Sequence, residues 1–408
     1  MFPESVYFFL HVAIVNDNHS HYHIKLVNPK SDILIKLVCF FIVRLGIQKI
    51  AKEKIMMTRI AMTHYRKATK QALIMLIAMV SFTGSFGSAE ATEINIYSSR
   101  SPELVQPMLD AYTAETGVTF NILYLAKGMA QRLVSEGEAS PADVIMTVDI
   151  ARLSELDHMG IFAAVDSPIL RSNIPAKWRD DDHHWFGLTT RARVAVVSID
   201  RVQSDELMRL EDLADPRWQG RICTRAGSHP YNRALLASLV AHLGEDAATE
   251  WAQGLVANMA RKPQGNDRAQ ASAIFAGRCD VALMNTYYYG LMKHNLEKTE
   301  QQDWAKAVRI VFLNQGDGDR GQHVNITGAG ILDSSQNYDA SVQFLEWLSG
   351  PKGQSIYSSI NYEYPVNPRV MPDEEIASWG SFRADDLPVS DIADHADTAQ
   401  RIINKTGW

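Results

Sequence analysis

The sequence predicts an α/β protein of two lobes, with mixed sheets, helices on both sheet faces and a ligand cleft between the lobes. Short apolar segments alternate with amphipathic segments over residues 93–146, which is typical of strands and their connecting helices in a covered sheet. The same alternation starts again near residue 222, and no low-complexity linker separates the two series. Two series without a flexible tether indicate two lobes joined by crossover strands.

The first series begins with a strand at residues 93–97. The helix after it carries apolar residues at helical spacing from Leu104 to Tyr112, and Gly117 ends it. We then expect a strand at 118–125, a helix at 129–136 and a short apolar strand at 143–146.

The second series follows a longer strand at residues 193–199. The expected helices cover 205–213, 232–243, 247–259, 269–277 and 339–349, and the expected strands cover 280–285, 308–313 and 327–332. From this order we expect residues 92–190 and about 320–368 to form lobe 1, and residues 191–319 and about 369–408 to form lobe 2.

The segment at residues 62–91 has the organisation of a Sec signal peptide. A basic stretch at 62–70 precedes an apolar run at 72–80, and small residues follow at 87–91. The apolar run is shorter than the roughly 20 residues that span a bilayer, so we expect no membrane anchor. The sequence therefore predicts export to the periplasm. Residues 1–61 precede this signal, and we expect them to be a leader that is either not translated or not structured.

Charge, motifs and cysteines limit the possible functions. The net charge of −7 gives no reason to expect a nucleic-acid partner. The sequence contains no G-x-S-x-G elbow, P-loop or H-E-x-x-H pair, so we do not expect an enzyme. Cys223 and Cys279 lie beside apolar strands. In an oxidising compartment they can form a disulfide, and two buried thiols remain the alternative.

Three consecutive tyrosines, Tyr287, Tyr288 and Tyr289, follow the expected strand at 280–285. Phenolates are hard oxygen donors, and neighbouring ones can converge on a hard cation such as Fe3+. The alternative is simple packing, because aromatic residues suit strand ends and core seams. Ligands of open α/β sheets bind beyond the carboxyl ends of strands, which favours the functional interpretation.

Basic and hydroxyl side chains also stand where strands end or cross between lobes. Arg100 follows the first strand, and the segment Thr189, Thr190, Arg191 and Arg193 lies at the expected crossing. Hydroxyls and an arginine fork suit an oxyanion such as carbonate or phosphate, although salt-bridged surface arginines are the alternative.

The loop at 180–184 combines three aspartates with two histidines, so either a divalent-metal site or a solvated loop fits it.

Six stretches together give the chain from about residue 93 onward a family resemblance. They are Ile96 to Arg100, Ser140 to Val144, Thr189 to Val194, Asn285 to Tyr288, Ser334 to Asn337 and Glu363 to Pro368. With them the chain resembles the ferric-ion-binding periplasmic proteins of bacterial iron ABC transporters, of the FbpA and FutA type. The resemblance implies a type II periplasmic-binding-protein fold that closes on Fe3+ by hinge motion. It also implies a monomer that delivers iron to an inner-membrane ABC permease and its ATPase.

The resemblance also assigns roles to particular residues. It implies that Tyr287 and Tyr288 are metal ligands and that Tyr289 is structural. The implied contacts of a synergistic anion such as carbonate are Thr189, Thr190, Arg191, Asn266 and Asn285. Further cleft residues would be Arg100, Ser101, Asp149 and Arg193.

The chain departs from the family pattern at three ligand positions. Ser101 stands where many relatives have histidine, and Ala192 and Val197 lie where members supply another tyrosine. We therefore expect two protein ligands, with water, carbonate, citrate or another small chelate in the remaining positions. The competing hypothesis keeps the fold but binds an anionic organic molecule, such as a phosphonate, thiamine phosphate or a carboxylate.

Overall fold

The computed structural model describes residues 13–17, 21–25 and 92–408. The chain divides into two compact units, Met1–Gly87 and Ser88–Trp408. In the first unit, strands β1 (Ala13–Asp17) and β2 (His21–Lys25) pair antiparallel. The expected signal peptide at 62–91 lies outside the described residues, as does most of the expected leader.

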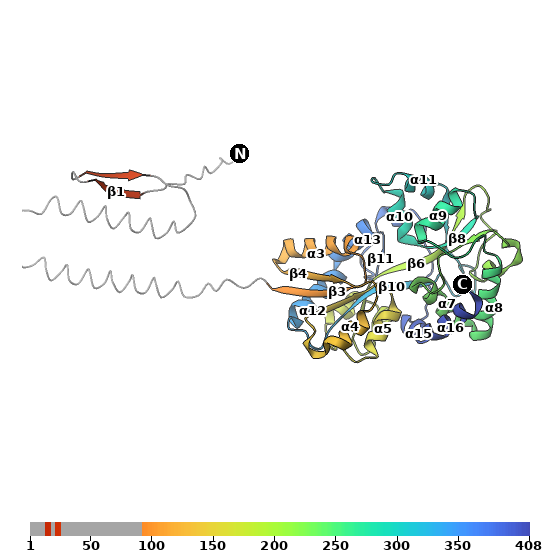
Figure 1. Ribbon diagram of the computed structural model, residues 1–408, viewed down its shortest axis with the longest axis horizontal. Coiled ribbons are helices and arrows are strands. Elements are labelled where there is room, and N and C mark those ends of the chain that lie inside the picture. The colour runs from red at the N-terminus through yellow and green to blue at the C-terminus, as the bar shows by residue number, and fades with distance from the viewer. Residues whose placement is uncertain (1–12, 18–20, 26–91) are drawn as a thin grey trace, which may run out of the picture. The chain divides into compact units, whose positions relative to one another are not determined.

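The second unit is a nine-stranded mixed sheet with helices on both sides (Figure 1). Its strands are β3 (Glu93–Ser98), β4 (Thr119–Tyr124), β5 (Val144–Thr147), β6 (Phe186–Ser198), β7 (Ile222–Cys223), β8 (Val281–Asn285), β9 (Val308–Val311), β10 (Val324–Ile331) and β11 (Tyr364–Pro365). The strand order is β4-β3-β5-β10-β6-β8-β7, and both β9 and β11 also pair with β6. Strands β3, β4 and β5 are mutually parallel, whereas β10 runs antiparallel to β5 and β6.

Helices surround this sheet in the order α3 (Pro102–Thr116), α4 (Met129–Glu136), α5 (Ile150–Asp157), α6 (Pro168–Asn173), α7 (Pro230–Leu243), α8 (Glu245–Ala257), α9 (Asp267–Phe275), α10 (Thr286–Lys293), α11 (Glu300–Lys306), α12 (Tyr338–Ser349), α13 (Pro351–Asn361), α14 (Glu374–Ala377), α15 (Val389–Asp394) and α16 (Ala396–Thr406). Short 3-10 helices cover Gly137–Ala139, Ala176–Trp178, Glu211–Ala214 and Pro216–Trp218. None of the described helices has the length and apolar character that crossing a bilayer requires.

Strand β6 is shared by two groups of strands. Its first part, up to Ala192, pairs with β10, and its second part, from Arg193 onward, pairs with β8. All thirteen of its residues are buried. The strand starts seven residues earlier than the expected strand at 193–199, because Thr189 and Arg191 have buried polar partners that the sequence does not reveal. Strand β6 thus carries the chain from one strand group to the other (Figure 1).

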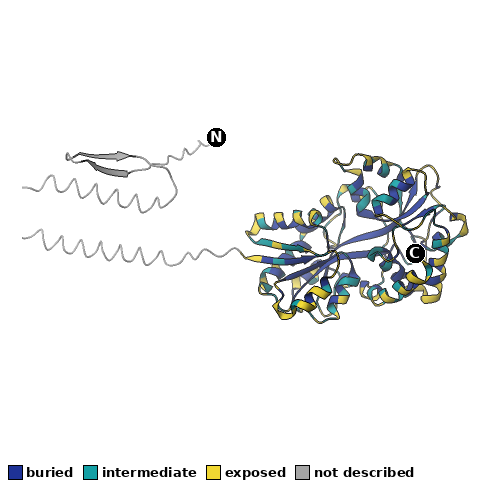
Figure 2. Ribbon diagram, in the orientation of Figure 1, coloured by how far each residue is buried: buried dark blue, intermediate teal, exposed yellow. Residues whose placement is uncertain are grey.

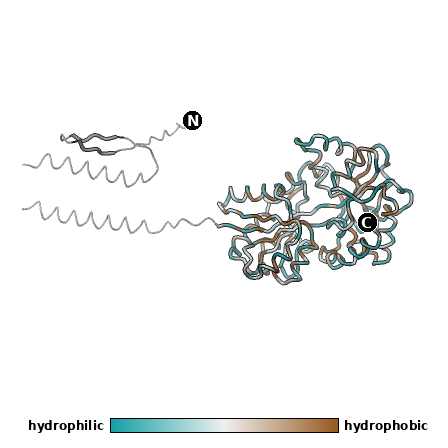
Figure 3. The backbone as a smooth tube through the Cα atoms, in the orientation of Figure 1, coloured by the Kyte–Doolittle hydropathy of each residue, from teal (hydrophilic) through white to brown (hydrophobic). Residues whose placement is uncertain are grey.

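The core lies between the sheet and the inner faces of the helices. The strands β5, β6, β8 and β10 are entirely buried, and exposed residues gather on the outer helix surfaces (Figure 2). The hydropathy follows the same division, with the apolar segments concentrated along the strands (Figure 3). One cluster shows how distant segments meet: Tyr112 of α3 packs against Phe120 of β4 and Phe344 of α12, with ring centroids 5.9 and 5.1 Å away.

The helix at 102–116 ends as the sequence predicts. Gly117 has φ = 77°, and its N–H donates to the carbonyl of Thr113. This left-handed conformation is accessible to glycine without the steric cost that a Cβ imposes. The helix expected at 205–213 is wrong, since only a 3-10 helix at Glu211–Ala214 forms there. Met208 is exposed and Asp212 accepts hydrogen bonds from the N–H groups of Met208 and Arg209, which gives the backbone a local alternative to helix.

Cys223 at the end of β7 and Cys279 before β8 form a disulfide. The bridge joins residues 56 positions apart and fixes β7 beside β8. Replacing both cysteines by serine is expected to lower the free energy of unfolding by about 4 kcal/mol, because the cross-link restricts a long loop in the unfolded chain. Urea unfolding measures this loss. An unchanged midpoint in the double variant would contradict the expectation, and wild type under reducing conditions is the control.

Candidate functional site

The tyrosine segment begins helix α10 directly after strand β8. The phenol of Tyr287 is buried, with 4% of its surface exposed, and Tyr288 is half-buried. Their ring centroids are 4.3 Å apart. Tyr289 packs its edge against Trp379 at a centroid distance of 5.9 Å. Tyr287 and Tyr288 therefore form a pair, and Tyr289 has a packing contact of its own.

A third phenol, Tyr231, completes this group. It lies in the first turn of α7, and its hydroxyl is 3.0 Å from the hydroxyl of Tyr287. Sequence reasoning missed this residue. The pairing of two strands could have identified it. β7 and β8 are parallel neighbours, so the helices that follow them start at the same edge of the sheet. A tyrosine early in the helix after β7 is thus expected near one early in the helix after β8.

The phenols are surrounded by positive charge. The guanidinium carbons of Arg191, Arg193 and Arg225 lie 5.8, 5.8 and 5.3 Å from the ring centroid of Tyr231. The guanidinium of Arg268 lies 5.0 Å from the ring centroid of Tyr288. These distances are within the range of cation–π attraction. The same charges would stabilise negative oxygen atoms that form in this region.

The buried carboxylate of Asp267 organises the arginines. It accepts hydrogen bonds from Arg193 at 3.0 Å, from Arg225 at 3.1 Å and from the N–H of Asn285 at 2.9 Å. Burial alone would raise the pKa of the Asp267 carboxyl, but Arg193 and Arg225 outweigh this effect and hold the pKa below its ordinary value. Arg193 also donates to Asn232 and Asn285. The network ties β6, α7, α9 and β8 together around the phenols.

Replacing Asp267 by asparagine is expected to destabilise the fold by about 3–5 kcal/mol, because two buried guanidinium groups lose their counter-charge. Chemical denaturation of the protein without added metal measures the change. Asp303→Asn is the matched control, since Asp303 pairs with Lys306 on the exposed surface and is expected to cost less than about 1 kcal/mol. Equal losses in the two variants would contradict the role given to Asp267.

Both members of the tyrosine pair resist ionisation in the absence of a cation. Burial, with Tyr231 and Tyr288 beside it, raises the pKa of Tyr287 well above its ordinary value. Burial and Tyr231 likewise raise the pKa of Tyr288. Burial lowers the pKa of the neighbouring His229 to about 3, and Arg225 and Arg193 add to this effect. His229 is therefore neutral, and its Nδ1 accepts from the N–H of Tyr231 at the start of α7.

The expected anion-binding residues fall into different environments. Arg191 is buried, donates to Thr327 at 3.3 Å and forms no ion pair with a described carboxylate. Thr190 lies beside it in β6 and is also buried. Thr189 donates its hydroxyl to Glu363 at 2.7 Å, and Asn285 accepts from Arg193 at 2.8 Å. Asn266 is exposed, and its Oδ1 caps α9 by accepting from the N–H of Ala269.

The further expected cleft residues are mostly engaged within the protein. Arg100 is buried and forms an ion pair of 2.9 Å with Glu363, so its charge already has a partner. Arg193 is paired with Asp267. Asp149 is buried and caps α5 by accepting from the N–H of Arg152 at 3.2 Å. Ser101 precedes α3 but makes no side-chain cap. Of the arginines expected here, Arg191 alone has no carboxylate partner among residues 92–408.

The loop at 180–184 does bring carboxylates and an imidazole together. Nδ1 of His184 is 2.8 Å from Oδ1 of Asp157 and 3.7 Å from Oδ2 of Asp180. The three groups place ligand atoms within 4.8 Å of one another. Internal hydrogen bonds already occupy these groups, since Asp180 also accepts from the N–H groups of Asp182 and His184.

Comparison with known proteins places the chain in a family. Residues 139–381 match the family model described as bacterial extracellular solute-binding protein. Iron uptake protein A1 of Synechocystis is 41% identical over 320 residues, which cover 78% of this chain and 88% of that protein. The major ferric iron-binding protein of Neisseria meningitidis serogroup B is 28% identical over 325 residues, covering 77% and 93%.

Comparison with solved structures points to the same family. The apo ferric ion-binding protein A of Pasteurella haemolytica has a TM-score of 0.74 at 41% identity, covering 78% of this chain and 98% of that chain. The Trichodesmium FutA protein in complex with iron and citrate ligands has a TM-score of 0.73 at 40% identity, covering 78% and 99%. The resemblance and the periplasmic-binding-protein fold predicted from the sequence are confirmed. The chain therefore belongs to the family of bacterial extracellular solute-binding proteins.

Proposed function

We propose that this protein captures Fe3+ in the periplasm and delivers it to an inner-membrane ABC permease and its ATPase. The observation that carries the proposal is the convergence of Tyr231, Tyr287 and Tyr288 at the ends of the neighbouring strands β7 and β8. Relatives named as iron uptake and ferric iron-binding proteins support the same metal. In this proposal residues 62–91 are the export signal, and the mature chain acts as a monomeric binding protein rather than an enzyme.

Charge balance favours a trivalent ion at this position. Three phenolates neutralise Fe3+, and the arginines around Tyr231 leave a positive surplus for an anion. We assign Tyr287 and Tyr288 as ligands, add Tyr231 as the third, and give Arg191 the contact with a synergistic anion such as carbonate. Thr190 in the first part of β6 and Asn285, which pairs with Arg193 in its second part, complete the surroundings of that anion.

The proposal also gives the two strand groups a mechanical role. Residues 92–190 with about 320–368 form one lobe and residues 191–319 with about 369–408 the other, and the lobes close by bending where β6 and β10 pass between them. In this arrangement Tyr231, Tyr287 and Tyr288 all belong to the second lobe. The first lobe closes over the ion and the accompanying anion.

Titration of iron-free protein with ferric nitrilotriacetate in carbonate buffer tests the proposal. Ferric phenolate absorbs visible light by charge transfer, so we expect a band that saturates at one equivalent of iron. The absence of a band would contradict the proposal, as would tight calorimetric binding of a phosphonate or thiamine phosphate without iron. The second result would support an anionic organic ligand instead.

A further inference from the structure

The phenol of Tyr231 belongs to a helix that begins after an irregular loop. The loop comprises residues 224–229, between β7 and α7, and Tyr231 is the second residue of α7. Strand β7 has only two residues, so little regular pairing fixes the path of the chain before the loop. The disulfide between Cys223 and Cys279 fixes the point at which the loop starts. The position of Tyr231 therefore depends on what holds the rest of the loop.

Trp408 packs against the middle of this loop. It lies just after α16, and 5% of its surface is exposed. Its carbonyl accepts a hydrogen bond from the N–H of Gly227 at 3.1 Å. Its indole leaves no room for a side chain at Gly227, because a Cβ there would lie 2.7 Å from Cγ of Trp408. The loop backbone thus contacts both the main chain and the ring of Trp408.

The indole of Trp408 is itself held in place. It meets the ring of Trp251 in α8 edge-on, with the centroids 5.6 Å apart. Nε1 of Trp251 in turn donates to the carbonyl of Leu210 at 2.8 Å. Helix α16 packs against α7 and α8 and buries Ile402 and Ile403. Trp408 is therefore a firm support for the loop.

The side chain of Asn232 fastens the loop to helix α7. Asn232 is fully buried and follows Tyr231 directly. Its Nδ2 donates to the carbonyls of Arg225 and Ala226 at 3.0 and 3.1 Å. Ala226 is adjacent to Gly227, so a displacement of the loop at Gly227 changes the hydrogen bonds of Asn232. The contact with Trp408 is thereby linked to the residue beside the phenol.

The phenol of Tyr231 must be placed accurately to share an ion with Tyr287. The two hydroxyls are 3.0 Å apart, and they come from different helices. Binding groups work well only when packing and hydrogen bonds hold them within about 0.5 Å of the productive geometry. A loop that shifts by more than this distance would move Tyr231 away from the ion.

We propose that Trp408 is a positioning residue for the ferric site. By holding Gly227 it fixes the 224–229 loop, and through Asn232 it keeps the phenol of Tyr231 where the phenol can bind the ion. The inference rests on the proposed function, because it takes Tyr231 as the third ligand. It extends that function by giving the segment after α16 a role in metal affinity.

A double-variant cycle with Tyr231 tests this proposal. The ferric affinity of wild type, Trp408→Leu, Tyr231→Phe and the combined variant is measured with ferric nitrilotriacetate in carbonate buffer, against a competing chelator. We expect Trp408→Leu to bind about tenfold more weakly than wild type, at the lower end of the range for groups outside the ligand shell. In the Tyr231→Phe protein we expect the same change to cost less than about twofold, because the phenol that it positions is absent.

Two further variants examine the same contact. Gly227→Ala must displace the loop or the indole, so we expect it to weaken ferric binding by about tenfold. It replaces Trp408→Leu in the cycle if that protein does not fold. Trp408→Phe keeps an aromatic ring beside Gly227 and is expected to bind within about threefold of wild type. The visible band of Trp408→Leu is expected to shift in the same direction as that of Tyr231→Phe.

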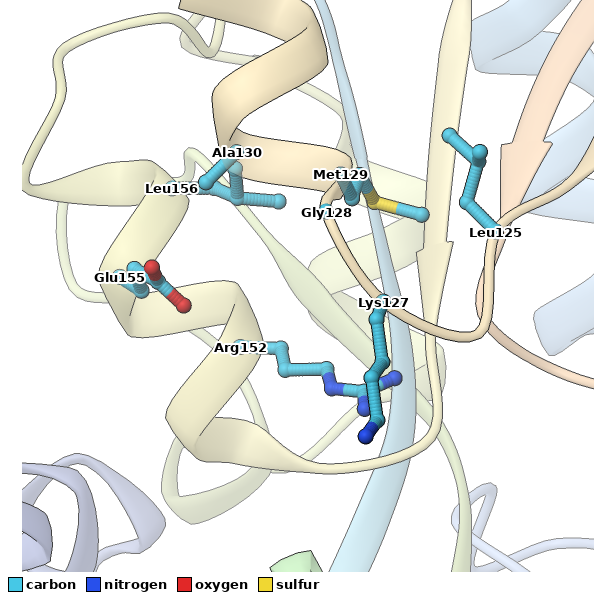
Figure 4. Close-up of a pocket in the computed structure, with 8 residues that line it drawn as sticks. All are labelled: Leu125, Lys127, Gly128, Met129, Ala130, Arg152, Glu155 and Leu156. Carbon is cyan, nitrogen blue, oxygen red and sulfur yellow. The ribbon is translucent and has the colours of Figure 1, made fainter.

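Two controls account for a loss of stability alone. Trp178→Leu removes a buried indole of similar exposure, 6%, from the 3-10 helix Ala176–Trp178. Leu156→Ala removes a buried side chain beside a pocket of about 210 Å3, whose lining residues all lie between Leu125 and Leu156 (Figure 4). Both variants are expected to lower the thermal midpoint while ferric affinity stays within about twofold of wild type.

The outcomes separate this proposal from the proposed function. Equal losses from Trp408→Leu with and without the Tyr231 hydroxyl overturn the positioning role. Unchanged affinity in both Trp408→Leu and Gly227→Ala overturns it as well, as does an equal loss in Trp178→Leu. If wild type does not bind ferric ion, or if Tyr231→Phe binds it as tightly as wild type, the proposed function with its three phenolate ligands is overturned instead.

Discussion

Replacing Tyr287 and Tyr288 together by phenylalanine is expected to weaken ferric binding by at least about 10³-fold and to abolish the visible band. Phenylalanine keeps the ring packing of the pair but removes both oxygen donors. Loss of a partner outside the ligand shell already costs roughly 10–100-fold in metal affinity, so loss of two ligands should cost more. Competition against a chelator of known affinity measures the change.

Tyr289→Phe is the matched control for this experiment. Tyr289 is the next residue of the same helix and packs against Trp379, so its variant is expected to retain the band and the affinity. Tyr231→Phe should weaken binding and shift the band while leaving it visible, since two phenolates remain. A band that persists in the Tyr287→Phe/Tyr288→Phe protein would show that other groups hold the iron.

Iron binding is expected to weaken by up to about a thousandfold for each unit that the pH falls. Burial raises the pKa of Tyr287 and of Tyr288, so both phenols are protonated in the iron-free protein at neutral pH. The ferric ion must displace these protons, together with the proton of Tyr231, to form three phenolate bonds. Each displaced proton contributes about a factor of ten per pH unit. Ferric binding is therefore expected to be tighter at higher pH.

Calorimetry in buffers of different ionisation enthalpy counts these protons directly. We expect about three protons released per ferric ion by wild type and about two by Tyr231→Phe. Each count must be corrected for the protons that the supplied ferric complex itself exchanges, which titration without protein provides. An identical count in the two proteins would remove Tyr231 from the set of phenolate ligands.

Much of the sheet was predictable because its strands are short, apolar and regularly separated by helices. The strand at β6 was predicted only in its second part, where Val194 to Val197 are apolar. Its first part contains Thr189 and Arg191, whose burial depends on Glu363 and Thr327 far along the chain. Such partners are found only when the chain is folded, so the local pattern did not extend the predicted strand to these residues.

The site was predictable in part for a similar reason. Tyr287 and Tyr288 are adjacent and follow a clear strand, so their position pointed to a ligand. Tyr231 is 56 residues earlier, and the strand before it, β7, has only two residues. Its relation to Tyr287 depends on the pairing of β7 with β8. In the proposed site, Tyr231 of α7 takes the place of the tyrosine that family members have near the positions of Ala192 and Val197.

The arginines show that the role of a charged residue cannot be predicted from its position in the sequence alone. Arg100, Arg191 and Arg193 look equivalent in sequence, since each follows or lies in a strand near the expected crossing. In the structure Arg100 is paired with Glu363 and Arg193 with Asp267, whereas Arg191 has no described carboxylate partner. The partner carboxylates lie 263 and 74 residues away. Which arginine is available for an anion therefore depends on tertiary contacts.

An anomalous-difference map of the iron-loaded crystal, recorded at the iron absorption edge, tests the central claim most directly. We predict one peak within bonding distance of the phenolic oxygens of Tyr231, Tyr287 and Tyr288. A peak at Asp157, Asp180 and His184, or no peak beside the three phenols, would contradict the account.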